Sequence, residues 1–219
     1  MNTVIIGGNR GIGLELAKQY KEKGHNVIVL CRKSSEGLEA LGVEVITNID
    51  VREDELINNI SEKVPCEKID NLIHVSGILL SDRFPHLSMD NMRESFEVNT
   101  LGPLRTIMGL ANKLSQGSKV GILTSRVGSI EDNSSSGNYA YRTSKTAVNM
   151  IGKCLSLDFK DKGIAVALLH PGYVRTDMTG GNGLIEVDES AHGLIMQMDK
   201  LCIESSGIFV HTSGEILTW

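Results

Sequence analysis

The stretch NTVIIGGNRGIGLELAKQY, residues 2–20, gives the strongest indication of the fold of this chain. It begins with a short β-branched run, passes through a glycine-rich turn and continues as an amphipathic pattern with helical spacing. Glycine permits tight turning and close backbone approach, and the first amides of a following helix are free to bind a phosphate. The stretch therefore predicts a strand, a phosphate-binding turn and a helix, in that order.

The same strand-then-helix order continues to the end of the chain. Near-continuous apolar strands that alternate with helices indicate a parallel sheet covered by helices on both faces. We therefore expect one doubly wound α/β domain over residues 1–219, with about seven strands. Strands are predicted at 2–6, 26–30, 43–47, 71–75, 119–124, 164–170 and 207–210, and helices at 11–23, 34–41, 52–63, 88–115, 139–161 and 188–202.

Composition excludes several classes of protein. The 219 residues are 41% hydrophobic and 22% charged, which is typical of a folded chain. A net charge of −5 argues against nucleic-acid binding, and the longest apolar runs are too short to cross a membrane. The four cysteines are scattered without a Cys-x-x-Cys pair. We expect free thiols, no metal site and, since no signal peptide is evident, a cytoplasmic protein.

The glycine turn itself has the spacing Gly7-x-x-x-Gly11-x-Gly13, with Asn9, Arg10 and Ile12 between the glycines. This differs from the familiar G-x-G-x-x-G pattern, and a plain glycine-rich turn is the alternative interpretation. Its place after the first strand of an alternating α/β chain favours a dinucleotide site in a Rossmann-type fold.

The end of the second predicted strand reads VLCRK, residues 29–33, and contains no carboxylate. Binders of a free ribose 2′-hydroxyl usually carry an acidic residue at this position. Arg10 and Arg32 from adjacent loops are suited to hold a 2′-phosphate, although both can also be ordinary solvated arginines. The pattern favours NADP(H) over NAD(H).

The segment SGNYAYRTSK, residues 136–145, contains two tyrosines and one lysine. In a helix, Tyr141 and Lys145 share a face one turn apart, whereas Tyr139 points elsewhere. The spacing selects Tyr141 as the candidate for chemistry. By itself a Tyr-x-x-x-Lys pair is more often ordinary helix surface.

Five motifs in order resemble the short-chain dehydrogenase/reductase family, in particular its C-factor-like and carbonyl-reductase-like members. They are GGNRGIG (7–13), EVNTLGP (97–103), LTSRVG (123–128), YAYRTSK (139–145) and HPGYVRTDM (170–178). The resemblance implies that Tyr141 is the general acid/base and that Lys145 and an oxidised nicotinamide lower its pKa. It also implies that Lys145 holds the nicotinamide ribose, that Ser125 binds the substrate oxygen and that Asn99 anchors a water leading to Lys145.

The resemblance assigns further cofactor contacts along the predicted carboxyl edge of the sheet. Asp50 and Val51 match the pair that receives the adenine, with Asp50 accepting from the adenine amino group, and Gly77 would lie against a ribose. The positions implied around the nicotinamide are Pro171, Gly172, Val174 and Thr176.

Two departures from the family pattern concern the sheet. Ile6 stands where a threonine is usual, which removes a side-chain hydrogen bond beside the glycine turn. The sequence HVSG, residues 74–77, replaces the usual Asn-Asn-Ala-Gly and so loses an asparagine that ties neighbouring strands. We interpret His74 as structural rather than catalytic.

The implied function is NADPH-dependent reduction of an aldehyde or ketone, reversible as alcohol oxidation. The expected partners are a small-molecule substrate and further copies of the chain, paired through the helices at 88–115 and 139–161. Leu79, Leu80 and Tyr173 are expected to line the substrate site. Arg126 either attracts an anionic substrate or forms a salt bridge. The alternative function is that of a C-factor-like signalling protein that binds a nucleotide with little turnover.

Overall fold

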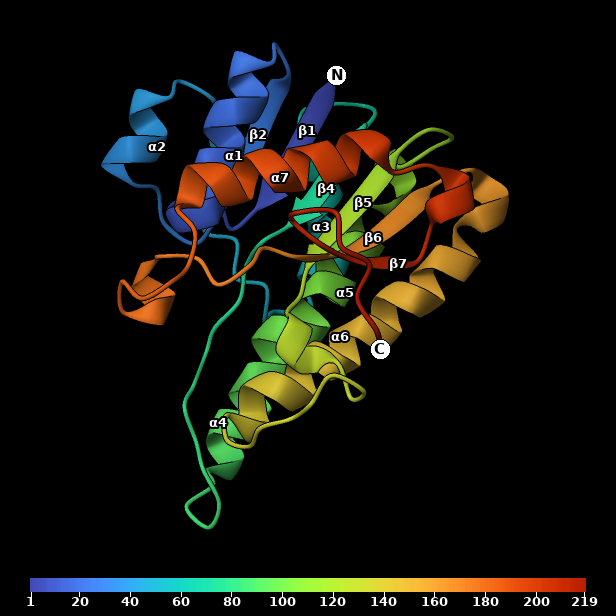
Figure 1. The fold of residues 1–219 in the computed structure, drawn as a ribbon. Coiled ribbons are helices and arrows are strands. Elements are labelled where there is room, and N and C mark those ends of the chain that lie inside the picture. The colour runs from blue at the N-terminus through green and yellow to red at the C-terminus, as the bar shows by residue number, and fades with distance from the viewer.

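The computed structural model describes residues 1–219, and one seven-stranded parallel sheet forms its centre (Figure 1). The strands lie in the order β3-β2-β1-β4-β5-β6-β7. Their bounds are β1 Asn2–Ile6, β2 Asn26–Leu30, β3 Glu44–Ile46, β4 Asn71–His74, β5 Lys119–Leu123, β6 Ala165–His170 and β7 Ile208–His211. The predicted doubly wound α/β fold is confirmed, and each strand end lies within one residue of its predicted position.

Helices cover both faces of the sheet. One face carries α1, α2 and α7, and the other carries α3, α5 and α6. In Figure 1, α7 crosses the strands beside α1. The bounds are α1 Gly11–Glu22, α2 Glu36–Ala40, α3 Leu56–Lys63, α4 Met89–Phe96, α5 Gly102–Leu110, α6 Tyr139–Asp158 and α7 Val187–Lys200. None of these helices has both the length and the apolar character needed to cross a bilayer.

Strand β1 shows why the central strands are apolar at nearly every position. Val4 and Ile6 pack into the core beneath α3, α5 and α6, whereas Ile5 packs into the core beneath α1 and α7. Successive residues of a strand point to opposite faces, so a strand buried on both faces has little room for polar side chains. The apolar runs in the sequence therefore correspond directly to the two cores.

The helix predicted over 88–115 is interrupted. After α4, residues Glu97–Leu101 form a π-helical turn, α5 follows, and Ala111–Lys113 close the segment as a 3₁₀ turn. Pro103 has no N–H to donate to the carbonyl of Asn99, so the regular i to i−4 ladder cannot continue through this point. The π-helical turn places the side chain of Asn99 in a fully buried position.

Strand β1 lies between β2 and β4, so β2 and β3 extend the sheet on one side of β1 and β4 to β7 extend it on the other. In doubly wound folds, ligands bind outside the carboxyl ends of the strands at this switch point. The fold therefore directs attention to the loops after β1, β2 and β4.

Candidate active site at the carboxyl edge of the sheet

A cavity of about 460 Å³ opens at the carboxyl edge, across the switch point. Its walls come from the ends of β1, β2, β4, β5 and β6 and from α6. Most of the predicted cofactor-binding residues line it, namely Gly7, Asn9, Arg10, Gly11, Ile12, Gly13, Arg32, Asp50, Val51, Gly77, Tyr141, Lys145, Pro171 and Thr176. Gly172 and Val174 lie outside the lining. The structure thus brings together residues separated by up to 169 positions in sequence.

The glycine turn forms the floor of the cavity. Gly7 has a φ of +90°, and a Cβ there would lie 2.3 Å from Ser76 Oγ. A Cβ at Gly13 would lie 2.2 Å from the carbonyl oxygen of Gly7. The amides of Gly11, Ile12 and Gly13 have no backbone acceptor, as expected at the start of α1. This helix start can hold a phosphate group close to the backbone.

The departure at Ile6 is compensated by the backbone. The carbonyl oxygen of Ile6 accepts hydrogen bonds from the amides of Val75 (2.8 Å) and Ser76 (3.0 Å). The Ile6 side chain itself is buried in the core. The end of β1 is therefore tied to the loop after β4 without the side-chain bond that a threonine would make.

Two exposed arginines flank the predicted adenosine end. Arg32 follows β2 and has no ion-pair partner, so its guanidinium is free to meet an anion. Arg10 Nη1 lies 3.5 Å from Asp177 Oδ2, with both side chains well exposed. An exposed pair at this distance is weak and does not prevent Arg10 from turning to a stronger anion.

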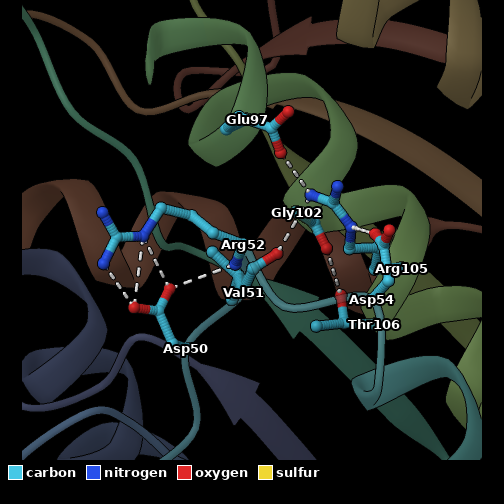
Figure 2. A network of polar contacts seen from close by, with 8 residues as sticks. All are labelled: Asp50, Val51, Arg52, Asp54, Glu97, Gly102, Arg105 and Thr106. Atoms are coloured by element: carbon cyan, nitrogen blue, oxygen red, sulfur yellow. Dashed lines mark hydrogen bonds and ion pairs between the residues drawn. The ribbon is translucent and has the colours of Figure 1, made fainter. Parts of the chain in front are cut away.

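Asp50 is already paired in this structure, by a residue that sequence reasoning missed. Arg52 donates from Nε to Asp50 Oδ1 at 2.9 Å and from Nη2 to Oδ2 at 2.5 Å (Figure 2). Hydrogen bonding to Arg52 holds the pKa of the Asp50 carboxyl below its usual range, and the charge of Arg32 adds to this effect. Asp50 was expected to accept from the adenine amino group, but both of its carboxylate oxygens bind Arg52, which itself lines the cavity.

Figure 2 also shows Arg105, which lies between the loop after β3 and the π-helical turn that contains Asn99. Arg105 of α5 is almost fully buried and pairs with Asp54 and, at 2.9 Å, with Glu97. Its Nη1 also reaches the carbonyl oxygen of Val51 at 3.5 Å. One guanidinium therefore connects the loop after β3 with the π-helical turn.

Tyr141, Lys145 and Ser125 meet at the other end of the cavity. Ser125 follows β5, and its side chain is near enough to the Tyr141 hydroxyl to lower the pKa of that group. Lys145 Nζ donates to the carbonyl oxygen of Leu123 at 2.9 Å and lies 5.7 Å from the centre of the Tyr141 ring. Tyr139, in contrast, lies on the exposed outer side of α6. Of the two tyrosines, Tyr141 therefore lines the cavity and Tyr139 does not.

The pKa of Tyr141 is raised in this structure, whereas the family resemblance implied that it is lowered. Burial raises the pKa of Tyr141 to about 12, and the hydrogen bond with Ser125 only partly opposes it. Burial lowers the pKa of Lys145 to about 8. The protein groups alone therefore favour a neutral phenol, not the phenolate that a lowered pKa would produce.

Asn99 has a largely structural set of contacts. Its Oδ1 accepts from the amide of Ile78 at 2.8 Å, and its Nδ2 donates to the Ile78 carbonyl at 2.9 Å and to Ser144 Oγ at 3.0 Å. A Cβ on Gly77 would lie 3.2 Å from Asn99 Oδ1 and 3.6 Å from Lys145 Nζ. Asn99 is thus close to the lysine, but its amide binds the loop after β4.

His74 is buried in the sheet, away from the cavity lining. Its Nδ1 lies 3.0 Å from Thr106 Oγ1, and its Nε2 has no hydrogen-bond partner. Burial and the nearby Lys145 charge lower its pKa to about 3. These contacts support the structural interpretation of His74.

The segment after β6 carries the predicted nicotinamide contacts. Pro171 and Thr176 face the cavity, and the Pro171 carbonyl accepts from Ser190 Oγ at 2.7 Å. Gly172 has a φ of +89°, and a Cβ there would lie 2.8 Å from the Ile185 side chain. Val174 is buried and forms an isolated β-bridge with Ile185, which stabilises the segment that contains Thr176.

Leu79 and Leu80, which were expected to line the substrate site, are half-buried, and Tyr173 is exposed. None of the three lines the cavity. Arg126 is salt-bridged, because it pairs with Glu215 and lies 3.7 Å from Asp132.

Sequence reasoning missed a histidine pair on this side of the sheet. The rings of His170 and His211 are centred 5.0 Å apart, at the ends of neighbouring strands. The sequence could have indicated this pair, because each histidine stands at or next to the end of a predicted strand.

The sequence and the structure both resemble known proteins. The model of the family described as short chain dehydrogenase matches residues 1–184. The chain is 40% identical to 1-hydroxy-2-glutathionyl-2-methyl-3-butene dehydrogenase of Rhodococcus sp. (strain AD45), over 100% of both chains. It is 36% identical to C-signal of Myxococcus xanthus, over 71% of this chain and 93% of the relative. A carbonyl reductase from Pseudomonas aeruginosa PAO1 in complex with NADP has a TM-score of 0.88 and 29% identity, and the match covers 100% of this chain and 99% of that one.

Proposed function

Because the chain belongs to the short chain dehydrogenase family and is an oxidoreductase, we propose that it is an NADPH-dependent carbonyl reductase with Tyr141 as its general acid. One observation carries the proposal. The Tyr141 side chain has Ser125 as a neighbour that lowers its pKa, stands one helical turn from buried Lys145 and borders the same cavity as the glycine turn. A purely structural tyrosine has no need of these neighbours.

The proposed mechanism divides the work among three side chains. When bound, the nicotinamide supplies a hydride to the carbonyl carbon. Ser125 donates a hydrogen bond to the carbonyl oxygen, and Tyr141 transfers its proton as negative charge develops there. A phenol with a pKa of about 12 is protonated at neutral pH, which suits a proton donor. Lys145, mostly charged below its pKa of about 8, stabilises the phenolate that remains.

NADPH is the proposed cofactor because basic residues surround the adenosine end. Three arginines line the cavity there, Arg10, Arg32 and Arg52, and the unpaired Arg32 lies two residues after the end of β2. The NADP complex of the similar Pseudomonas protein supports the same choice. Guanidinium groups bind phosphate through charge-assisted hydrogen bonds that a ribose hydroxyl does not match.

Two measurements test the proposal. NADPH and NADH are first titrated against the purified protein by fluorescence, and aldehydes, ketones and quinones are then screened with the cofactor that binds. Tyr141→Phe is expected to lower kcat by about 10²–10⁴-fold while the NADPH Kd changes little. Tyr139→Phe, on the exposed side of the same helix, is the matched control and keeps full activity. Full activity in Tyr141→Phe would refute the mechanism.

The similarity to C-signal supports a second candidate, a nucleotide-binding signalling protein with little turnover. This candidate predicts cofactor binding without carbonyl reduction, and Tyr141→Phe would then leave the biological effect unchanged. Turnover of any carbonyl that depends on Tyr141 decides for the enzyme.

We further propose a homo-oligomer that pairs through α6. The outer side of this helix exposes Met150 and Leu157, and beside it lies an open groove of about 820 Å³ that includes Tyr139 and Trp219. Light scattering after gel filtration tests this, and a mass of 23.8 kDa, that of one chain, would refute it. The proposed location is the reducing cytoplasm, in keeping with four free cysteines.

A further inference from the structure

The loop after β4 is fixed at two points, one held by Asn99 and the other at the start of α6. At its base, the amide and carbonyl of Ile78 are held by Asn99. Further along, Asp82 binds the start of α6. We call residues 78–82 the strap. Leu79 and Leu80, the expected substrate wall, lie between these two fixed points. In Figure 1 the chain runs on beyond the strap, past the end of α4, before it returns to that helix.

Helix α6 has no N-terminal cap of its own. Its N-cap residue, Asn138, is in the left-handed region with a φ of +51°, and its side chain makes no capping hydrogen bond. The Asp82 carboxylate instead accepts from the amides of Tyr139 and, at 3.2 Å, Ala140. The Asp82 carbonyl also accepts from the amide of Asn138 at 2.8 Å. The cap of α6 is therefore supplied by a residue 57 positions earlier in the chain.

This cap lies directly beside the proposed chemistry. Tyr141 is the third residue of α6, so it belongs to the same first turn whose amides Asp82 holds. Lys145 lies one turn further in and is fixed by its bond to the Leu123 carbonyl. Helix ends fray unless their free amides are bound. Of the pair Tyr141 and Lys145, only Tyr141 depends on the cap for its position.

We propose that Asp82 is a positioning residue for the reaction. It holds the first turn of α6, and with it the Tyr141 hydroxyl, in register with Ser125, while it fixes the strap expected to wall the substrate site. The inference rests on the proposed role of Tyr141. The competing explanation is that Asp82 only adds to global stability, as any helix cap does.

Three variants separate these explanations. Asp82→Ala removes both acceptors, and Asp82→Asn keeps one oxygen for two amide donors. Ser88→Ala is the matched control, because Ser88 caps α4 at the other end of the same loop, by accepting from the Asn91 amide at 3.2 Å. The readouts are kcat per NADPH-binding site with the best model carbonyl of the screen, the KM for that carbonyl, and amide hydrogen exchange at residues 139–142.

For Asp82→Ala we expect kcat per site to fall about tenfold or more, since small misplacements of a reacting group are costly. Amide exchange at residues 139–142 rises, whereas the NADPH Kd stays within about twofold because the glycine turn is untouched. Asp82→Asn loses about threefold in kcat, since one of two acceptors remains. Ser88→Ala leaves kcat and exchange at residues 139–142 as in the wild type. If Asp82→Ala does not fold, the loss in Asp82→Asn decides.

Faster exchange with an unchanged kcat per site would reduce Asp82 to an ordinary cap and overturn the proposal. Unchanged exchange in both Asp82 variants would overturn it as well. Failure of the proposed function is seen separately, because either the wild type would reduce no carbonyl in the screen or Tyr141→Phe would retain full activity, whatever the Asp82 variants do.

Discussion

Replacing His74 with asparagine should make the protein less sensitive to acid. His74 is buried at the end of β4, with Nδ1 shared with Thr106 and Nε2 without a partner. A proton on this ring would bring an unsolvated charge into the core near the Lys145 ammonium, so its pKa falls from 6.5 to about 3. Asparagine is polar and of smaller volume and does not titrate.

The sign and size follow from proton linkage. Between pH 6.5 and about 3 the unfolded chain binds a proton at His74 that the folded chain does not, so stability falls as pH falls. From pH 7.5 to pH 5 this one group removes about 2 kcal/mol of unfolding free energy, at about 1.36 kcal/mol per pKa unit. The loss should be absent from His74→Asn.

The assay is urea unfolding at pH 7.5 and pH 5.0, followed by the fluorescence of Trp219, the only tryptophan. The quantity compared is the change in unfolding free energy between the two pH values, so that titration of other groups cancels between variants. His86→Asn, at an exposed position, serves as the control and should behave as the wild type. A pH-dependent loss in His74→Asn within about 0.5 kcal/mol of the wild-type loss would refute the reasoning.

Three shorter predictions concern the glycine turn, Arg32 and Arg126. Gly7→Ala places a Cβ 2.3 Å from Ser76 Oγ at a φ of +90°, so it should cost more stability in urea unfolding than Gly24→Ala, whose Cβ meets nothing within 4 Å and which carries only about 1 kcal/mol of backbone strain. Equal losses would contradict this. Arg32→Ala should raise the NADPH Kd by about tenfold or more and leave the NADH Kd nearly unchanged in fluorescence titration. A parallel loss for both cofactors would rule out a 2′-phosphate contact. Arg126→Gln should change kcat/KM by less than about threefold for neutral and anionic carbonyls alike, because acidic partners already neutralise this arginine. A loss confined to anionic substrates would show direct recognition.

Most of the fold was predictable from local pattern. Strands buried on both faces must be apolar, so apolar runs such as NVIVL at 26–30 predict the strand bounds to within one residue. The interruption of the helix over 88–115 was not predictable, because its sequence remains helical in character. Only Pro103 indicates that the regular backbone hydrogen bonds are broken there. The π-helical turn is fixed by tertiary contacts, such as the hydrogen bond from Thr100 to the Ser144 carbonyl.

The candidate site also contains residues that the sequence could predict and residues that it could not. Residues within motifs, such as Tyr141 and the glycine turn, reach the cavity because each follows a strand whose carboxyl end faces it. Arg52 was missed because nothing in the sequence shows that its side chain folds back onto Asp50. Asp82 was missed for a similar reason, since the helix start that it binds lies 57 residues away.

The strand order also shapes how the chain folds as it is synthesised. β1 pairs with β2 after a short helical connection, but its other neighbour, β4, begins only at Asn71. At roughly 10 residues per second, about 4 s separate the synthesis of β2 from that of β4. During this interval one edge of a highly apolar strand has no partner, which is the condition that favours aggregation. The nascent chain, more than the finished protein, is therefore the state in which this strand edge is open to association.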